Sequence, residues 1–502
     1  MFFDMTTRKI CEIIERGAST RLSDKAFLEK EISEWLTSRK RMNQIEGDGY
    51  YGYEQAILQK QRLVVGENGQ LVPQTDLPNH KMIDNQYGGM VDQKVNYMLS
   101  KPITFKTENK SYSEALENIF NKSFHRLIKN VGKDSYNGGI GYIYPYYDEN
   151  GEFKFKRFHP WEVKVFWKDD DKTEIDCFIR FYEVKGYEGN VKTIYHYIEV
   201  YDTNGIHRFE WKNGGLIPDY STYHFETDTD GQTVEHNWER VPLVPFKANS
   251  ACTPLLKKCK SLQDGINQIL SEFCDGMEEN ASGNSIIIIK NYDGENLGTF
   301  RRNLSQYKAV KVRTVDGADG GIDKLEINVN CENYKTVLAV LRRSLIENCK
   351  GYDTNDLKSA GSPNEMTIKS IFSEIDLDAN ELETEYQASF EQLMWFVNKH
   401  LANTGVGNFE NEKLDVIFNR DMMVNESQII ADINASAAIL SKKTLISMHP
   451  WIDDVDAELK QLETEKQEEI DDLQNMMFQK TPPESDFKGD ENAIEGKSMQ
   501  NE

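Results

Sequence analysis

Residues 251–280 read ACTPLLKKCKSLQDGINQILSEFCDGMEEN, and their apolar side chains recur every three or four positions. This spacing predicts a long amphipathic helix. The same pattern in residues 332–351, ENYKTVLAVLRRSLIENCKG, predicts a second one. Between them the sequence predicts a small α/β unit, with strands at 284–290, 308–315 and 323–330 and a helix at 294–307. The two helices therefore leave and re-enter the body, and we interpret the unit between them as a projection.

The chain before this projection divides into a helical region and a β region. Residues 1–135 show mostly helical spacing, and one run, 23–45, begins at a cap that is either Ser23 or Asp24. In residues 139–245 the apolar period changes to two, and short aromatic-rich segments alternate with Asn-Gly and Gly-rich turns. This pattern is typical of an antiparallel β region, in which we expect six to eight strands.

The chain after the projection is mainly helical. A polar, glycine-containing loop leads to Ser362-Pro363-Asn364-Glu365, a capping box with proline at the first helical position. It predicts a helix that runs to about Leu401, on the order of 55 Å long at ~1.5 Å per residue. The sequence then predicts a strand at 413–421, a helix after Asn425, a charged helix at 455–477 and a disordered tail from Thr481.

Length and charge limit the classes of function. A chain of 502 residues is long enough for several structural units with a sizeable core. Its formal net charge of −24 disfavours a protein that wraps DNA tightly, because tight binding needs a basic surface. Residues 453–502 hold 16 acidic and 5 basic side chains, so −11 of that charge lies near the C-terminus. No apolar stretch approaches the roughly 18 residues of a membrane span, and the charged N-terminus predicts an unexported product.

Cysteine and histidine usage predicts neither disulfides nor a metal. The seven cysteines are scattered without a C-x-x-C pair, which argues against a disulfide framework and against a zinc ribbon. Cys252 and Cys259 lie seven residues apart, two turns of the predicted helix, and we interpret them as small buried side chains. The nine histidines form no metal-like pair, so we expect no metal and no cofactor.

Known catalytic patterns are missing from the sequence, which has no P-loop, dinucleotide-binding glycine motif, zinc-protease motif or nucleophile elbow. The glycine-rich segment 138–141 leads into a strand, so it lacks the helix N-terminus of a phosphate cradle. The acidic run 169–171 could bind a divalent cation, but a solvated turn is the more common interpretation. Asp353 and Asp356 could be an acid–base pair, but no nucleophile accompanies them. The sequence therefore predicts no enzyme and no catalytic residue.

The aromatic residues of the β region fit two interpretations. A row of exposed rings could stack on nucleic-acid bases, whereas the half-buried faces of a sheet need the same residue types. Packing within the sheet is by far the more common reason for such a pattern, and we expect it here.

The order of these segments resembles that of the portal proteins of tailed bacteriophages. In both, a helical and β-rich body is followed by a helix–α/β–helix projection, a loop, a long capped helix and a helical acidic C-terminus. The chain is most similar to the portal family typical of siphophages of Gram-positive hosts. Three segments also look like that family: MVDQKVNYMLSKPITF (90–105), RVPLVPFKAN (240–249) and SKKTLISMHPWIDDVDAELKQLETEK (441–466).

The resemblance implies an α+β portal-type subunit with a helical and β wing, a two-helix stem, a small α/β clip, a long kinked helix and a helical crown. By position, the wing would be residues 1–250, helical over 1–135 and antiparallel β over 139–245. The stem helices would be 251–281 and 332–350, with the clip at 282–331 between them and a tunnel loop at 351–362 after them. The long helix and its return to the wing would be 363–412, the crown 413–480, and a disordered acidic tail 481–502.

The resemblance also implies a function and a set of partners. The chain would form a homododecameric ring at one vertex of the capsid, a channel through which double-stranded DNA is packaged, retained and ejected. Its partners would be the terminase large subunit, then the head-completion adaptor and tail proteins, together with scaffolding and major capsid proteins, and no membrane. The protein would be made in the host cytoplasm and reside in the virion, with neither a cofactor nor a metal.

Two sets of residues follow as candidates. Lys358 is the one basic residue of the loop 352–362, and we expect it to touch DNA weakly together with Asn355 and Ser359; an ordinary surface loop is the alternative. The stem helices should present an apolar stripe to their neighbours and a polar face to the channel, although the same stripe would be a core face in a monomer. Its members are Leu262, Ile266, Ile269, Phe273, Val337, Leu341 and Leu345. The run Ile286–Ile289 is either an inner strand of the clip or a strand of a sheet shared between subunits, and we favour the shared sheet.

Two other classes of function compete with this interpretation. One is a structural virion protein without a channel. The other is a carbohydrate-active enzyme, in which the aromatic β region would stack on sugars and paired acids would cleave them.

Overall fold

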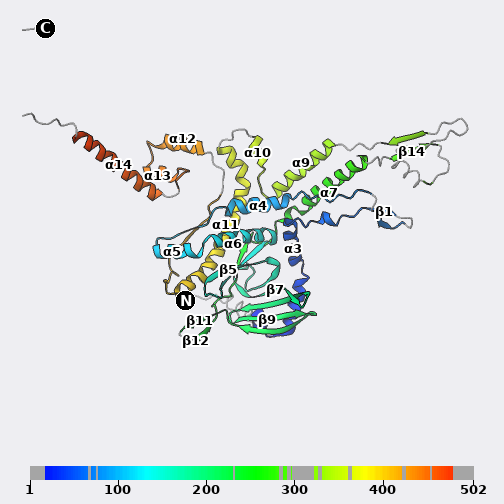
Figure 1. Cartoon of the computed structure of the whole chain (residues 1–502), viewed down its shortest axis with the longest axis horizontal. Helices are drawn as coiled ribbons and strands as arrows, with labels where there is room; N and C mark the ends of the chain where they lie inside the picture. The colour runs from blue at the N-terminus through cyan, green and yellow to red at the C-terminus, as the bar shows by residue number, and fades with distance from the viewer. Residues whose placement is uncertain are drawn as a thin grey trace, which may run out of the picture. The chain divides into compact units, whose positions relative to one another are not determined.

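The protein is described here by a computed structural model that covers residues 17–65, 69–74, 77–229, 232–281, 286–290, 296, 321–325, 331–359, 365–420, 426–452 and 455–478. Its mixture of helices and strands is α+β, as the sequence predicts (Figure 1). The chain divides into two units, Met1–Ser362 with Lys369–Met422, and Pro363–Ile368 with Met423–Glu502. None of the described helices is both long and apolar enough to cross a membrane.

The N-terminal helices begin at capping side chains. Asp24, one of the two expected caps, accepts hydrogen bonds from the N–H groups at the start of α2. Ser38 caps a separate helix, α3, so the run 23–45 is two helices and not one. The elements of this region are η1 (Ala18–Arg21), α2 (Lys25–Leu36), α3 (Arg39–Tyr51), η2 (Ala56–Gln59), β1 (Leu63–Val65), β2 (Leu71–Pro73), α4 (Gln86–Leu99), β3 (Thr104–Lys106), α5 (Lys110–Ile119) and α6 (Lys122–Gly138).

The β region is antiparallel throughout, as expected, but its described residues form ten strands, more than the six to eight predicted. A five-stranded sheet has the order β10-β9-β8-β7-β6, a three-stranded sheet has the order β13-β4-β5, and β11 pairs with β12. The elements are β4 (Ile140–Tyr147), β5 (Phe153–Phe158), η3 (Pro160–Glu162), β6 (Val163–Trp167), β7 (Ile175–Glu188), β8 (Val191–Asp202), β9 (Gly205–Lys212), β10 (Gly215–Thr222), β11 (Phe225–Thr229), β12 (Gln232–His236) and β13 (Val244–Lys247).

The aromatic residues of this region fill the space between sheets. Tyr142, Tyr144, Phe158, Phe178 and Tyr201 are all at least 92% buried and belong to one hydrophobic cluster. Rings buried in this way are not available to stack on nucleic-acid bases or on sugars. Sheet packing, the expected reason for the aromatic pattern, therefore holds for these five.

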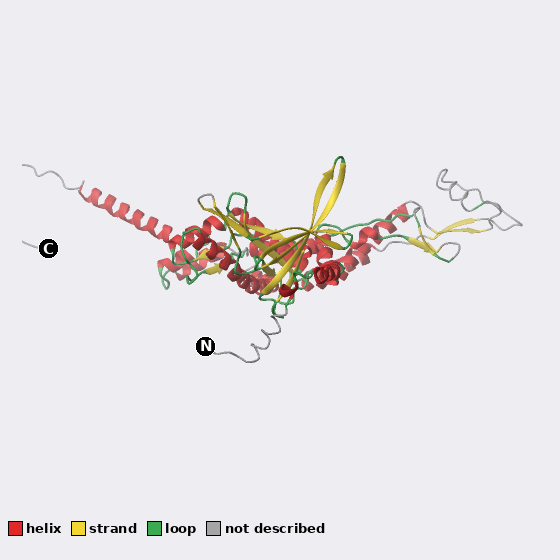
Figure 2. Ribbon diagram, turned by 90° about the horizontal axis from the view of Figure 1, so that it is seen from below, coloured by secondary structure: helices red, strands yellow, loops and turns green. Residues whose placement is uncertain are grey.

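Two long helices follow the β region. α7 (Leu256–Ala281) and α9 (Cys331–Asn348) pack side by side, and both lead to the strand pair β14 (Ile286–Lys290) and β15 (Gly321–Leu325) (Figures 1 and 2). β14 is the predicted isoleucine strand, and it pairs antiparallel with β15 of the same chain. β15 begins at Gly321, slightly earlier than predicted. The helix predicted at 294–307 (apart from Asn296) and the strand predicted at 308–315 lie outside the described residues.

The segment after α9 differs from the prediction. A short helix, α10 (Thr354–Ser359), occupies some of the predicted loop, because Asp353 accepts hydrogen bonds from the N–H groups that open it. The long helix α11 (Glu365–Asn403) has 39 residues and begins at the last residue of the predicted capping box. β16 (Asp415–Ile417) pairs with β3, so the first unit continues past residue 413, where we expected the crown to begin.

The second unit is helical where it is described. It contains α12 (Glu426–Ser436), α13 (Lys442–Ser447) and α14 (Val455–Phe478), which confirms the helix predicted after Asn425 and the charged helix predicted at 455–477. Several large apolar side chains of this unit are exposed, among them Ile439 (84%) and Trp451 (70%). The tail predicted from Thr481 lies outside the described residues.

The main hydrophobic core joins the helices of the first unit. Val91 of α4, Ile128 of α6, Ile266 of α7, Leu345 of α9 and Phe390 of α11 are fully buried in one cluster. A second cluster forms where α2 covers the five-stranded sheet. Because α7 and α9 contribute to the main core, their near ends are fixed to the body.

Gly139 determines how α7 leaves the body. Its φ of +81° lies in the left-handed region, and an added Cβ would be 2.2 Å from the carbonyl oxygen of Cys252. The N–H of Leu255, just before α7, donates to the carbonyl of Tyr136 in α6 at 2.8 Å. The glycine cluster is therefore explained by close packing and not by a phosphate. Cys252 is buried as expected, but it precedes α7, so it does not share a helix with Cys259.

Replacing Gly139 by alanine should cost more stability than the same change at Gly151. Both glycines have positive φ, but nothing lies within 4 Å of a Cβ added at Gly151. Gly151→Ala should lower the free energy of unfolding by about 1 kcal/mol through backbone strain alone. Gly139→Ala should lower it by roughly 2–4 kcal/mol, since the Cys252 backbone must also move. Urea unfolding of the two variants measures the difference, and equal losses would contradict the packing role.

Candidate functional site

One face of α7 is polar and yet buried. Gln263, Asn267, Ser271 and Asp275 occur at every fourth position, which aligns them along one side of the helix. The first three have no exposed surface, and Asp275 is 6% exposed. Buried polar groups need hydrogen-bond partners, so another segment must supply them.

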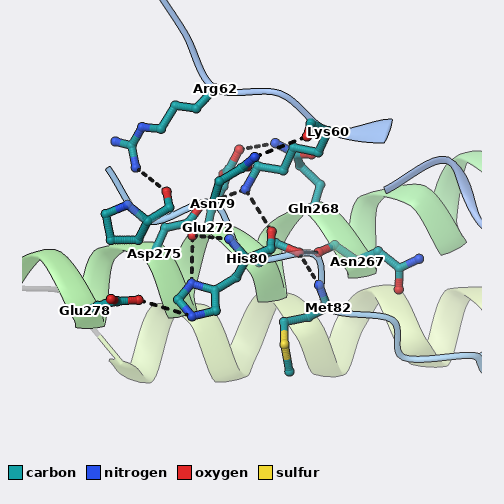
Figure 3. Close-up of polar contacts among 12 residues, drawn as sticks. Lys60, Arg62, Asn79, His80, Met82, Asn267, Gln268, Glu272, Asp275 and Glu278 are labelled. Atoms are coloured by element: carbon teal, nitrogen blue, oxygen red, sulfur yellow. Dashed lines mark hydrogen bonds and ion pairs between the residues drawn. The ribbon is translucent and has the colours of Figure 1, made fainter. Parts of the chain in front are cut away.

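That segment is 79–87, which we call the strap. The N–H groups of His80, Met82 and Asp84 donate in turn to Asp275 Oδ1 (2.7 Å), Ser271 Oγ (2.9 Å) and Asn267 Oδ1 (2.9 Å). At the end of the strap, Gln263 Oε1 accepts from the N–H of Tyr87 at 3.0 Å, and Gln263 Nε2 donates to the carbonyl of Asp84 at 2.7 Å. We call this ladder of contacts the polar seam, and Figure 3 shows its outer part, around His80, Met82 and Asp275.

The seam works because two periods coincide. Alternate residues of an extended chain lie about 6.6 Å apart, and every fourth residue of a helix lies about 6.0 Å apart. An extended segment that runs antiparallel to α7 therefore meets a new helical side chain at every second N–H group. Each of these main-chain donors obtains an acceptor, and the strap is fixed in register with the helix.

The outer end of the seam is charged. Lys60 Nζ lies 2.7 Å from Asp275 Oδ2, and His80 Nδ1 lies 2.8 Å from Asp275 Oδ1 (Figure 3). His80 Nε2 is 3.3 Å from Glu278 Oε2. Burial alone would raise the pKa of Asp275, but hydrogen bonds from Lys60 and His80 outweigh it and lower that pKa.

The polar seam corrects our expectation for the polar face of the stem. We expected polar side chains of α7 to face a channel, whereas Gln263, Asn267 and Ser271 are covered by the strap of the same chain. The sequence carried a signal for this: the face has short hydrogen-bonding side chains at regular spacing in place of Lys and Glu. Such side chains reach neighbouring main-chain groups more readily than solvent.

The opposite face of α7 packs on α9. The rings of Phe273 and Tyr334 have centroids 5.0 Å apart, and Leu341 lies against Gly265. The predicted contact residues fall into three groups by exposure. Ile266 and Leu345 are fully buried inside the chain, Leu262, Ile269, Phe273 and Leu341 are half-buried, and Val337 is 44% exposed. The stripe is thus mostly a packing surface within the chain, and Ile266 and Leu345 are not available to a second subunit.

The segment after α9 is held by α4. The side-chain amide of Gln93 pairs with the main chain of Tyr352: Nε2 donates to its carbonyl (2.9 Å) and Oε1 accepts from its N–H (3.0 Å). A Cβ at Gly351 would lie 2.6 Å from the sulfur of Met90, so glycine is needed for this approach. The ring of Tyr352 also packs on Phe372 of α11, with centroids 4.4 Å apart.

A buried ion pair lies beside this segment. Lys94 Nζ, on α4, is 2.7 Å from Asp378 Oδ2, on α11, and donates to the carbonyl of Lys350 at 3.2 Å. The Lys94 side chain is 1% exposed, and burial lowers its pKa although Asp378 opposes the shift. Tyr136 Oη donates to the same Asp378 oxygen at 3.2 Å. One carboxylate therefore joins α4, α6 and α11 at the end of α9.

The three predicted DNA-facing residues lie in or at the end of α10. Asn355 is exposed, and its N–H donates to Asp353 Oδ1 at 2.8 Å. Lys358 and Ser359 are the last two residues of this helix. Asp353 thus has a capping role. A structural role for this carboxylate is therefore favoured over acid–base chemistry with Asp356.

The other chemical candidates have structural explanations. Asp169 accepts hydrogen bonds from the N–H groups of Thr173 and Glu174, so the acidic run 169–171 forms a turn. No group of three or more potential ligands that could hold a metal occurs in the described part of the chain. Cys259 and Cys349 are both buried, between α7 and α9; the hydrogen bond between their thiols, together with burial, raises the pKa of Cys259.

Comparison with known proteins gives matches over most of the chain. A family model described as "Phage portal protein, SPP1 Gp6-like" matches residues 28–472. The chain belongs to this portal family. It is also similar to the portal protein of Bacillus phage SPP1, with 28% identity over 428 residues that cover 84% of this chain and 83% of the relative. The portal protein of Clostridium phage phiCD119 is 25% identical over 440 residues, 85% of this chain and 93% of the relative.

Membership of the portal family bears on the competing interpretations. Portal proteins are structural components of the phage virion, which supports the prediction that the chain is not an enzyme. The resemblance inferred from the order of segments is thereby confirmed. The carbohydrate-active alternative has no support from the family, and five of the aromatic residues it would use are buried in the core.

Truncating the seam should destabilise the fold more than truncating its exposed neighbour. Asn267→Ala and Ser271→Ala should each lower the free energy of unfolding by about 1–3 kcal/mol, because the N–H of Asp84 or Met82 loses its buried acceptor. Gln268→Ala, on the exposed side of the same helix, should change it by less than about 0.5 kcal/mol. Urea unfolding measures the losses, and hydrogen exchange at Met82 and Asp84 should accelerate in the matching variant. If exchange there is unchanged, the strap is not held by these side chains.

Proposed function

We propose that this chain is the subunit of a ring at one vertex of a phage capsid, the channel through which double-stranded DNA is packaged, retained and ejected. The observation that carries the proposal is the match to the portal family from residue 28, within α2, to residue 472, within α14. The name and the coverage of the two relatives support it. We take twelve copies as the working number, as the resemblance implies.

The segments of the chain suit the roles that such a ring requires. We assign α7 and α9 as the stem, residues 282–330 as the clip, the segment 351–362 as the tunnel loop and α11 as the helix that joins loop and body. The crown is taken from residue 423, since β16 pairs with β3 in the first unit. Exposed apolar side chains of α12–α14 and the adjoining turns, such as Ile439 and Trp451, are surfaces that a ring would bury.

The contacts around the tunnel loop support its assignment. Residues 350–352 are fixed by Lys94, Gln93 and Phe372, so the loop leaves a rigid base. A loop that starts from a fixed base can contact a moving polymer without displacing the body. Asn355, Lys358 and Ser359 remain our candidates for contact with DNA, and Lys358 would meet phosphate.

The charge of the chain suits passage of DNA. Each phosphate that a protein neutralises adds affinity through counterion release, so a channel with many basic contacts would hold DNA in place. A net charge of −24 with one basic residue in the loop 352–362 keeps such contacts few. We infer a channel that touches DNA briefly.

The proposed partners follow from the position of the ring. The clip would dock the terminase large subunit during packaging, and then the head-completion adaptor and tail proteins. The outer surface would contact scaffolding and major capsid proteins. The protein would be made in the host cytoplasm and reside in the virion.

The purified chain should assemble into closed rings. Light scattering should give a mass near twelve times 58.0 kDa, and negative-stain images should show a central hole. A chain that stays monomeric at all concentrations would contradict the proposal. Assemblies without a central hole would favour a structural virion protein that lacks a channel.

Removing the basic residue of the tunnel loop should weaken contact with DNA slightly and without sequence preference. For Lys358→Ala rings, the slope of the logarithm of DNA affinity against the logarithm of salt concentration should become shallower. The change should correspond to about one phosphate contact for each loop that engages DNA. Particles made with this variant should package or retain less DNA, measured as the length of DNA they contain. Lys30→Ala is the control, because that lysine is 74% exposed on α2. Unchanged packaging, ejection and salt dependence would remove Lys358 from the mechanism.

A further inference from the structure

The β1–β2 hairpin exposes apolar side chains on a surface that the described part of the chain leaves open. Leu63, Val65, Leu71 and Val72 are 46%, 71%, 63% and 42% exposed. The register pairs Leu63 with Pro73 and Val65 with Leu71, so Leu63, Val65 and Leu71 share one face of the hairpin. A lone hairpin of three-residue strands is not stable in water by itself, and an apolar face of this kind needs a partner.

The base of this hairpin is fixed, although its face is open. Gln74 N–H donates to the carbonyl of Arg62 at 2.8 Å, which closes the strand pair. Arg62 Nη1 donates to the carbonyl of Pro78, and Asn79 Nδ2 donates to the carbonyl of Lys60 (Figure 3). Through Lys60 and Asp275 these contacts continue into the polar seam. The hairpin is thus held along one flank of α7.

α9 lies on the other flank of α7. Residues two apart in a helix point about 200° apart, so Ser271, which binds the strap, and Phe273, which packs on Tyr334 of α9, face opposite sides. Figure 1 accordingly shows α7 between α9 and the hairpin. The order across the projection is hairpin, α7, α9.

Part of the outward surface of α9 is also apolar. Val340 is 58% exposed and Val337 is 44% exposed, and between and beside them Thr336 and Ala339 are exposed as well. Exposed valines are unusual choices for a helix surface, since β-branched residues also lower helix propensity. Residues 336–340, TVLAV, include no charged side chain.

We propose that the apolar face of the β1–β2 hairpin packs on residues 336–340 of α9 in a neighbouring copy of this chain. A closed ring repeats one head-to-tail contact, and that contact needs two different, complementary flanks on each copy. The hairpin and α9 supply such a pair on opposite sides of α7. The inference rests on the proposed ring and names the surfaces that close it beside the stem.

Lysine substitutions test the contact through the stability of the assembly. Leu71→Lys and Val340→Lys should each raise the concentration at which the assembly dissociates by about tenfold or more, because a charge would be buried in an apolar contact. Val191→Lys is the control, since Val191 is 67% exposed at the tip of the β7–β8 hairpin. Mass photometry over a dilution series measures the three variants against the wild-type chain.

A photo-crosslinking residue at position 71 tests the contact directly. Trypsin cuts after Lys335 and Arg342, so the patch is released as the single peptide TVLAVLR, residues 336–342. Illumination should produce species larger than one 58.0 kDa chain on a denaturing gel, with residue 71 joined to this peptide. The same group at position 191 should give no such product.

The outcomes separate this inference from the proposed function. Suppose that the wild-type chain forms rings, that the lysine variants dissociate at the same concentration as the wild-type chain, and that residue 71 crosslinks to a peptide other than TVLAVLR. The hairpin contact is then wrong and the proposed ring stands. If the wild-type chain is monomeric, both fail. Loss of assembly in Leu71→Lys and Val340→Lys together with the linked TVLAVLR peptide establishes the contact.

Discussion

The main-chain donors of the strap cannot be buried without acceptors, and α7 supplies them from Gln263, Asn267, Ser271 and Asp275. This requirement determines much of the architecture. Since one face of α7 is occupied by the strap, its apolar face is left for α9 and the main core. The strap in turn fixes the start of α4 and the base of the β1–β2 hairpin. A single helix therefore positions a chain segment on each of its two flanks.

The near end of the same helix pair is fixed by the Lys94–Asp378 ion pair. Removing two charges from water costs free energy that their attraction only partly returns, so a buried pair is a weak source of stability. The geometry of the pair is more informative than its energy. Asp378 also accepts a hydrogen bond from Tyr136 Oη, and Lys94 also donates one to the carbonyl of Lys350. These contacts hold α4, α6 and α11 in one arrangement around the end of α9. The segment that follows α9 therefore starts from a defined position, which is what a loop inside a channel would need.

Most helices could be predicted from the sequence, because apolar spacing near 3.6 residues and caps such as Asp24 are local signals. The predictions failed at short elements, which have too few residues to show a clear period, and where distant contacts decide. α10 forms in a polar segment through the Asp353 cap, and the β region contains short strands that weak alternation does not reveal. From spacing alone we predicted that Cys252 shares a helix with Cys259. In the structure Cys252 lies in a buried loop, and this position depends on the close approach of its main chain to Gly139. Among the candidate site residues, Ile266 and Leu345 proved to be core, since the same spacing fits a core face and a subunit contact.

Charge pairing within the chain makes some of its basic groups unavailable to DNA. Lys60, Lys94, Arg180 and Arg420 each lie against carboxylates of their own chain, and all four side chains are less than one-fifth exposed. Such cations are already neutralised and partly desolvated, so binding phosphate would first require breaking these pairs. With a formal charge of −24, the remaining surface is acidic on balance. A channel built from these subunits would release few counterions as DNA passes, and its resistance would therefore depend more on the width of the channel than on affinity.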